Sequence, residues 1–265
     1  MQAFEYQQPK SVADAVKALA AGGGDAKFIA GGQTLLPAMR LGLAAPAALI
    51  DLDRVDGLKG ITVDGKTITI GAMTRHAEVA ASDAVKKAIP ALAHLAEMIG
   101  DRQVRNRGTI GGSVANNDPA ACYPSAVLAL DATIKTDKRS IAAKDFFKGL
   151  YETALEPNEL LVSITFTAPE KSAYYKFRQQ ASHFPIVGVF VAKTAAGARV
   201  AITGAGPVVF RVKAIEDALD KNWAPESCDG ITVDASGLNG DMHASAEYRA
   251  HLIPVLAKRA VAEAK

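Results

Sequence analysis

Two glycine pairs, each next to a hydroxyl residue, are the stretches of this sequence best suited to holding a ligand. The first lies in residues 28–35 (FIAGGQTL) and the second in residues 109–113 (TIGGS). Glycine permits positive φ angles and a close approach of the main chain, so consecutive N–H groups can point at one anion. The hydroxyls of Thr34 and Ser113 could donate further hydrogen bonds. A diphosphate is the ligand that would best fit two such turns facing each other.

Either pair taken alone is more typical of an ordinary tight turn. Neither belongs to a GxGxxG fingerprint or to a GK[ST] phosphate loop, so the common nucleotide-binding folds are not indicated. A third pair, Gly204 and Gly206, is followed by Pro207, which has no amide N–H to offer a phosphate. The prediction of a dinucleotide site therefore depends on the first two pairs acting together.

Three arginines precede the second glycine pair, at positions 102, 105 and 107. Side chains at this spacing cannot all point the same way from a helix or a strand. We expect Arg105 to lie near the ligand, and the other two to be solvated or to contact another subunit.

The remaining residue patterns exclude several kinds of chemistry. The sequence has no G-x-S-x-G elbow, no Ser-His-Asp order typical of a hydrolase and no HExxH. Cys122 and Cys228 are far apart and lack the spacing of a zinc or iron–sulfur site. We therefore expect no catalytic side chain and no metal on this chain, and both thiols to be free.

The composition indicates a folded protein without a nucleic-acid or membrane-spanning surface. The chain has 265 residues, of which 49% are hydrophobic, and a net charge of only +2 with basic residues scattered along it. The N-terminus lacks the regions of a signal peptide, and the longest apolar runs are too short to span a bilayer. A cytoplasmic location, with peripheral attachment at the inner membrane face left open, is the expectation.

The pattern of elements predicts an α+β fold in three units. In residues 1–56 we expect a helix capped by Ser11, a strand before the first glycine pair, a helical turn and a second strand. In residues 57–168 we expect a strand at 66–74, a short helix capped by Thr74 and a longer helix at 88–100. A helix opened by Pro124 should pass into a strand within residues 125–136, and further strands should follow at 139–147 and 159–166. Residues 171–265 should form a hairpin closed at 195–197 and two helices, the last kinked or interrupted at Pro254.

The motifs AGGQTLL, IGAMTRHAEV and GDRQVRNRGTIGGSVANNDPAACYP together resemble the FAD-binding subunits of molybdenum hydroxylases. The sequence is most similar to the medium subunits of aerobic carbon monoxide dehydrogenases and, more remotely, to the flavin domain of xanthine dehydrogenases. The resemblance covers nearly the whole chain. It implies a vanillyl-alcohol-oxidase (PCMH) type FAD-binding domain at 1–168, with subdomains at about 1–56 and 57–168. A C-terminal domain of the carbon monoxide dehydrogenase flavoprotein type follows at 171–265.

By the resemblance, the two glycine turns hold the pyrophosphate and ribityl chain of FAD from both sides. The implied cofactor-binding residues are Phe28, Ile29, Ala30, Gly31, Gly32, Gln33, Thr34, Leu35, Ile99, Thr109, Ile110, Gly111, Gly112, Ser113, Leu161 and Lys176, in addition to Arg105. Ile99 and Lys176 would lie by the flavin and Leu161 by the adenine. Cys122 stands where many relatives have an acid that accepts a bond from the sugar chain, and Asn117 or Asp118 could substitute for it. His183 stands where many relatives have Asp.

The resemblance also implies a function in electron transfer, with a large molybdenum-binding subunit and a small iron–sulfur subunit as partners in a dimer of heterotrimers. Electrons would pass through the flavin to an external acceptor such as a quinone or a cytochrome. Carbon monoxide is the first candidate substrate of the complex, before N-heterocycles, aldehydes and nicotinate-like acids. Two alternatives remain: a self-standing FAD-dependent oxidase or dehydrogenase, and a non-catalytic assembly scaffold of the same fold.

Overall fold

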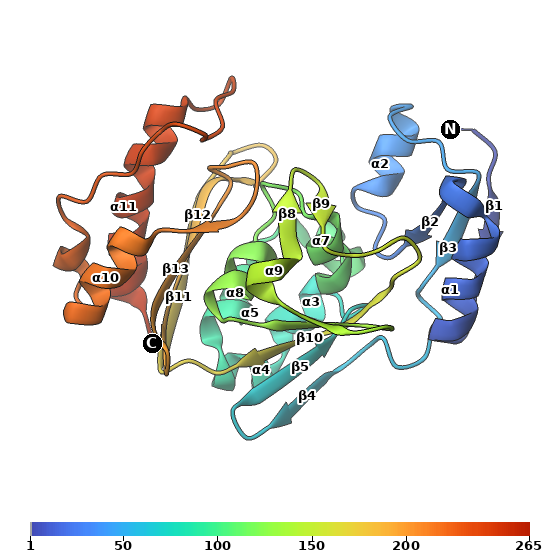
Figure 1. Cartoon of the computed structure of the whole chain (residues 1–265), viewed down its shortest axis with the longest axis horizontal. Coiled ribbons are helices and arrows are strands. Elements are labelled where there is room, and N and C mark those ends of the chain that lie inside the picture. Colours follow the sequence, from blue (N-terminus) through green and yellow to red (C-terminus); the bar gives the residue numbers. More distant parts are fainter. Residues whose placement is uncertain (1) are drawn as a thin grey trace.

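The computed structural model describes residues 2–265 and arranges them in three consecutive units (Figure 1). The first unit is a three-stranded parallel sheet of order β1-β3-β2, flanked by two helices. Its elements are β1 (Glu5–Gln7), α1 (Val12–Ala21), the 3₁₀ turn η1 (Gly23–Asp25), β2 (Ala26–Ile29), α2 (Leu35–Arg40) and β3 (Ala48–Asp51). The predicted cap of α1 is confirmed, because the Ser11 side chain accepts a hydrogen bond from the Asp14 amide.

The second unit is a five-stranded antiparallel sheet of order β4-β5-β10-β6-β7, covered by short helices. Its strands are β4 (Ile61–Asp64), β5 (Thr67–Gly71), β6 (Thr133–Thr136), β7 (Ser140–Ala142) and β10 (Leu161–Thr167), with the small hairpin β8 (Phe147–Gly149) and β9 (Glu152–Thr153) beside it. Its helices are α3 (His76–Ala81), α4 (Asp83–Ala88), α5 (Pro90–Glu97), α6 (Arg102–Arg107), α7 (Ile110–Asn116), α8 (Tyr123–Ala129) and α9 (Ala143–Phe146). The core of this unit fills the space between sheet and helices.

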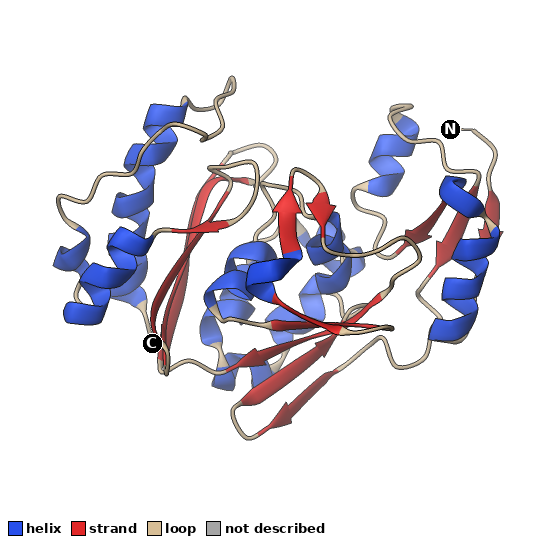
Figure 2. Cartoon of the chain, viewed as in Figure 1, coloured by secondary structure: helices blue, strands red, loops and turns tan. Residues whose placement is uncertain are grey.

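The third unit is a four-stranded antiparallel sheet of order β11-β12-β13-β14 with two helices (Figure 2). Its elements are β11 (Lys171–Arg178), β12 (Pro185–Thr194), β13 (Gly197–Thr203), β14 (Phe210–Arg211), α10 (Lys213–Lys221), the 3₁₀ turn η2 (Pro225–Cys228) and α11 (Ala246–Glu263). The predicted hairpin is confirmed, since Thr194 pairs with Gly197 across a two-residue turn.

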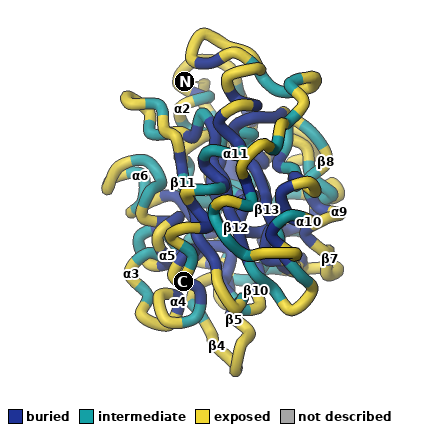
Figure 3. Tube along the Cα trace, turned by 90° about the vertical axis from the view of Figure 1, so that its left-hand side faces the viewer, coloured by how far each residue is buried: buried dark blue, intermediate teal, exposed yellow. Residues whose placement is uncertain are grey.

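The four-stranded sheet is buried on both faces. Helices α10 and α11 pack on one face, and α5 and α8 of the second unit pack on the other. Figure 3 shows the buried trace concentrated in these strands and helices and the exposed trace in the surrounding loops. Side chains of β11 therefore reach into the second unit, which positions part of the site described below.

The α+β fold is confirmed, and four local details of the structure differ from the predictions. Arg75, not Thr74, caps α3, because the Glu78 side chain accepts the Arg75 amide in a capping box. The predicted strand at 139–147 is divided into β7 and the short helix α9, and the predicted helix at 88–100 is shortened to α5. Helix α11 continues through Pro254, since its neighbours Ile253 and Leu256 are anchored in the core. None of the helices within residues 2–265 combines the length and the apolar character needed to cross a bilayer.

Candidate FAD site

The first glycine pair forms a cradle of free main-chain amides between β2 and α2. Gly32 has a left-handed backbone with φ of +72°, which glycine adopts without steric cost. Within the described residues, none of the amides of residues 31–35 donates a hydrogen bond to a protein group. Consecutive free N–H groups at a bend attract an anion. We call residues 31–35 the amide cradle.

The second glycine pair is the first turn of a helix, and its amides are already used. Thr109 caps α7 by accepting from the Gly112 amide, at 3.1 Å. The amides of Ile110 and Gly111 donate to the carbonyls of Thr74 and Ala72, at 3.1 and 2.8 Å. The prediction that both pairs expose amides to a phosphate is therefore wrong for this one. Glycine is needed at 111 because a Cβ there would lie 2.5 Å from the Ala72 Cβ.

The two glycine segments lie against each other, as predicted. A Cβ added to Gly31 would lie 2.3 Å from the Arg107 carbonyl oxygen, and one added to Gly112 would lie 3.2 Å from the Ala30 Cβ. The hydroxyl of Ser113 makes no hydrogen bond within residues 2–265 and is half-buried. The free amides and a free hydroxyl thus share one region, which is the arrangement that a pyrophosphate requires.

Lys176 reaches from β11 into the second unit and is almost fully buried, with 7% of its surface exposed. Its Nζ lies 2.7 Å from the Met98 carbonyl oxygen, 2.9 Å from that of His183 and 3.5 Å from Cys122 Sγ. An ammonium group has three N–H donors, and here all three have an acceptor. Lys176 therefore joins three segments that are far apart in the sequence.

Arg105 binds the bend that follows α5. Its Nη1 donates to the carbonyls of Ile99 and Gly100, at 3.0 and 3.2 Å. His183, which has a positive φ of 62°, brings its Nδ1 to 3.1 Å from the same Gly100 oxygen. The placement of Arg105 near the cofactor stays a prediction. We call residues 98–100, whose carbonyls are held by these basic groups, the Ile99 bend.

The two residues expected to substitute for an acid at Cys122 are not equally available. Asn117 is buried, and its Nδ2 donates to the carbonyls of Gly149 and Glu152, both at 2.8 Å. Both of its amide hydrogens are therefore used, whereas its Oδ1 accepts no hydrogen bond within residues 2–265. Asp118 is half-buried, accepts from the Ala120 amide at 2.8 Å and lies 3.4 Å from the Tyr151 hydroxyl. As acceptors for a ligand, Asp118 offers a carboxylate and Asn117 its amide oxygen.

The other predicted contacts differ in exposure. Ile99 is half-buried on the surface of the main core, and Phe28 and Ala30 are half-buried against the core of the first unit. Leu161 is only 4% exposed and belongs to the main core, so its side chain offers an adenine ring little surface. Gln33 and Thr34 are exposed.

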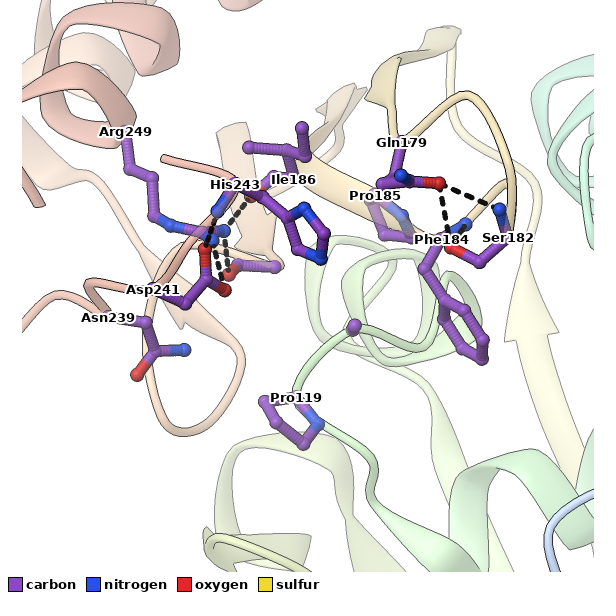
Figure 4. Close-up of a pocket in the computed structure, with 12 residues that line it drawn as sticks. Pro119, Gln179, Ser182, Phe184, Pro185, Ile186, Asn239, Asp241, His243 and Arg249 are labelled. Atoms are coloured by element: carbon purple, nitrogen blue, oxygen red, sulfur yellow. Dashed lines mark hydrogen bonds and ion pairs between the residues drawn. The ribbon is translucent and has the colours of Figure 1, made fainter. Parts of the chain in front are cut away.

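A cavity of about 280 Å³, which sequence reasoning missed, opens next to the loop that carries Cys122 (Figure 4). Its walls include Pro119, Phe184, Asp241 and Arg249, and it does not reach the amide cradle. Arg249 is buried, donates to the Gly204 carbonyl at 3.0 Å and pairs with Asp241 at 2.7 Å. The one sequence signal that could have indicated this cavity is an arginine on the apolar face of a helix, because arginine is rarely buried unless it is paired.

His76 lies behind the second glycine segment. Its Nε2 would be 2.5 Å from a Cβ at Gly108, whose carbonyl accepts the His76 amide at 2.9 Å. Burial, with a smaller contribution from the charge of Arg105, lowers the pKa of His76 to about 4. The imidazole is therefore neutral at neutral pH and supports the segment by packing.

Comparison with known proteins places these features in a family. Residues 2–169 match the model of the FAD binding domain in molybdopterin dehydrogenase, and residues 172–264 match that of the CO dehydrogenase flavoprotein C-terminal domain. The carbon monoxide dehydrogenase medium chain of Hydrogenophaga pseudoflava is 36% identical, over 97% of this chain and 96% of that protein. The nicotine 6-hydroxylase medium subunit of Paenarthrobacter nicotinovorans is 35% identical, over 99% and 97%.

A solved structure of carbon monoxide dehydrogenase from Hydrogenophaga pseudoflava superimposes with a TM-score of 0.90 at 35% identity, over 98% of this chain and 96% of that chain. The resemblance stated from the motifs is thus confirmed. The amide cradle agrees with FAD as the cofactor, because it offers main-chain donors to a pyrophosphate. The chain belongs to the FAD-binding medium subunits of the molybdenum hydroxylase family, an oxidoreductase family.

Proposed function

We propose that the pyrophosphate of FAD binds the amide cradle and the Ser113 hydroxyl, within a domain formed by residues 1–168. The free amides of residues 31–35 are the observation that carries this proposal. Thr34 is exposed beside them and can add its hydroxyl. Gly112 packs against Ala30, and Ser113 follows it directly in the chain, which supports a contact of the Ser113 hydroxyl with the same ligand.

The flavin end of the cofactor is assigned to the region of the Ile99 bend, Cys122 and Lys176. Helix α7 connects the two ends of the site: it starts at the second glycine pair and ends at the loop that leads to Cys122. Its seven residues span about 10 Å, which separates a phosphate end from a ring end. Asp118, in the same loop, is the carboxylate best placed to accept a bond from the sugar chain.

The function that this site supports best is electron transfer through FAD. The flavin supplies the redox chemistry when it is bound. The chain's own groups hold the dinucleotide, fix the Ile99 bend and surround it with basic donors. None of them is required to move a proton, which agrees with the lack of a catalytic side-chain constellation in the sequence.

We further propose that this chain works with a large molybdenum-binding subunit and a small iron–sulfur subunit, and passes electrons to an external acceptor. The medium subunits it resembles serve enzymes named for carbon monoxide, nicotine and glyceraldehyde. Since these share the chain's architecture, the substrate of the complex is set elsewhere, and carbon monoxide remains the first candidate. Both cysteines are free, as a reducing cytoplasm favours.

Purification of the protein from its native cell tests this proposal. We expect FAD in a one-to-one ratio with this chain and two further subunits, one containing molybdenum and one containing iron. A flavin-containing chain without partners would support a self-standing oxidase instead. A complete complex without flavin would support the assembly scaffold and contradict the proposal.

A further inference from the structure

Lys176 carries a buried positive charge that no carboxylate compensates. Within residues 2–265 no Asp or Glu oxygen lies within 4.0 Å of its Nζ, and its acceptors are two carbonyls and a thiol. The chain's other deeply buried cation, Arg249, pairs with Asp241 at 2.7 Å. Burial of an ammonium without a counter-charge is costly, so such a group is expected to serve a purpose.

The groups around Lys176 include no carboxylate. Tyr174, which precedes it by two positions on the same face of β11, is buried, and its hydroxyl has no hydrogen-bond partner in the described chain. Burial holds the pKa of Tyr174 well above its usual range, so the phenol stays neutral. Arg105 adds a second cation at the Ile99 bend, and the acids that flank the bend in sequence, Glu97 and Asp101, are both exposed.

We propose that Lys176 is a positioning residue whose charge, paired with no carboxylate, raises the reduction potential of the flavin, and that the presence of a cysteine instead of an acid at position 122 is what leaves the lysine without such a partner. The inference rests on the proposed function, which puts the flavin at the Ile99 bend. A flavin becomes more negative as it gains electrons, and a fixed positive charge in a water-poor site stabilises that form. The stabilisation shifts the midpoint potential upwards.

The same three hydrogen bonds also give Lys176 a mechanical role. They connect β11 of the third unit to the Ile99 bend and to the loop before β12. Removing the side chain would therefore change position and charge together. Substituting Cys122 separates the two effects, because Cys122→Asp keeps the lysine and its carbonyl acceptors while it places a negative charge beside the Nζ.

The test is an equilibrium redox titration of the bound flavin in the assembled enzyme. We expect Cys122→Asp and Lys176→Met to shift the midpoint potential to more negative values, and Lys176→Arg, which keeps the charge, to shift it less than Lys176→Met. Cys228→Ser and Lys171→Met are matched controls: Cys228 is the other buried thiol, in the core of the third unit, and Lys171 is exposed at the start of β11. Both should titrate like the unsubstituted protein.

Each outcome decides the inference. An unchanged or more positive potential in a fully flavin-loaded Cys122→Asp enzyme would overturn it and leave the proposed function intact. If Lys176→Met loses its flavin, Cys122→Asp alone gives the answer. An unsubstituted complex that contains no FAD would instead overturn the proposed function.

Discussion

Gly31 and Arg107 touch through their main chains: a Cβ at position 31 would lie 2.3 Å from the Arg107 carbonyl oxygen. Real Cβ atoms do not approach a carbonyl so closely, so position 31 must lack one. Two segments from different units therefore pack directly against each other, and the glycines in them have different structural roles. Gly31 and Gly111 permit packing, whereas Gly32 supplies the left-handed backbone of the amide cradle.

Gly32→Ala should remove the flavin and leave the protein folded. The Cβ would strain a backbone with φ of +72°, at a cost of about 1–2 kcal/mol, and meet only the flexible end of Leu36 at 2.9 Å. The amides on either side would lose their common direction. Flavin absorbance per chain, measured beside the free energy of unfolding, checks this.

Gly42→Ala is the matched control for that experiment. Gly42 also has a left-handed backbone, with φ of +75°, and an added Cβ would meet nothing within 4 Å. We expect a similar loss of stability with full flavin content. Equal flavin loss in the two variants would mean that backbone strain, not the amide cradle, controls flavin retention.

Gly111→Val, unlike the two substitutions above, should unfold the protein, because its side chain would enter the core at Ala72.

Cys122→Asp should retain FAD as well as the natural protein or more tightly. The carboxylate would accept a hydrogen bond from Lys176, whose Nζ lies 3.5 Å from the present Sγ, and could also accept one from the cofactor. The measurement is the rate of flavin release after dilution, followed by fluorescence. A sharply faster release would show that Cys122 does not face the cofactor.

The positions of the glycine pairs could be predicted from the sequence, but the state of their amides could not. Residue types alone made both pairs equal candidates for binding a phosphate. The carbonyls of Ala72 and Thr74, which take the amides of the second pair, come from a different motif and are placed by the sheet. The sequence around a glycine pair does not indicate where such acceptors from other segments will lie.

The lysine site shows the same limit. Lys176 was expected beside the flavin by resemblance alone, and its three acceptors come from Met98, Cys122 and His183, which only the packed fold brings together. Elements with strong periodicity were predicted well, such as α1 and the β12–β13 hairpin. The predictions of short elements were less accurate because tertiary contacts outweighed local secondary-structure propensity, as at the Arg75 cap.

His76 should make the protein less stable as the pH falls from 6.5 towards 4. Its pKa is lowered from 6.5 to about 4 by burial, so between these pH values the unfolded chain binds a proton that the folded chain does not bind. The contribution of neutral His76 to the free energy of unfolding is fully present above pH 6.5. About 3 kcal/mol of it should be lost between pH 6.5 and pH 4. Denaturant titrations at several pH values would measure it. His76→Phe should flatten the profile, and a change at the exposed His94 should not; identical slopes in all three proteins would refute the assignment.

Glu159 should govern stability in a lower window, from pH 4.5 towards 2. Arg139 binds both of its carboxylate oxygens at 2.9 Å and is the main cause that lowers the pKa of Glu159 to about 2. The carboxylate is therefore stabilising when charged, so its contribution is present above pH 4.5 and disappears on acidification. Because Arg139 is 43% exposed, we expect Glu159→Gln to cost only about 1–2 kcal/mol at pH 7 and almost nothing near pH 2. Glu156→Gln, at the exposed end of the same cluster, should lower the free energy of unfolding at pH 7 much less. An equal loss in the two variants would show that the Arg139–Glu159 pair does not stabilise the protein more than the exposed charge does.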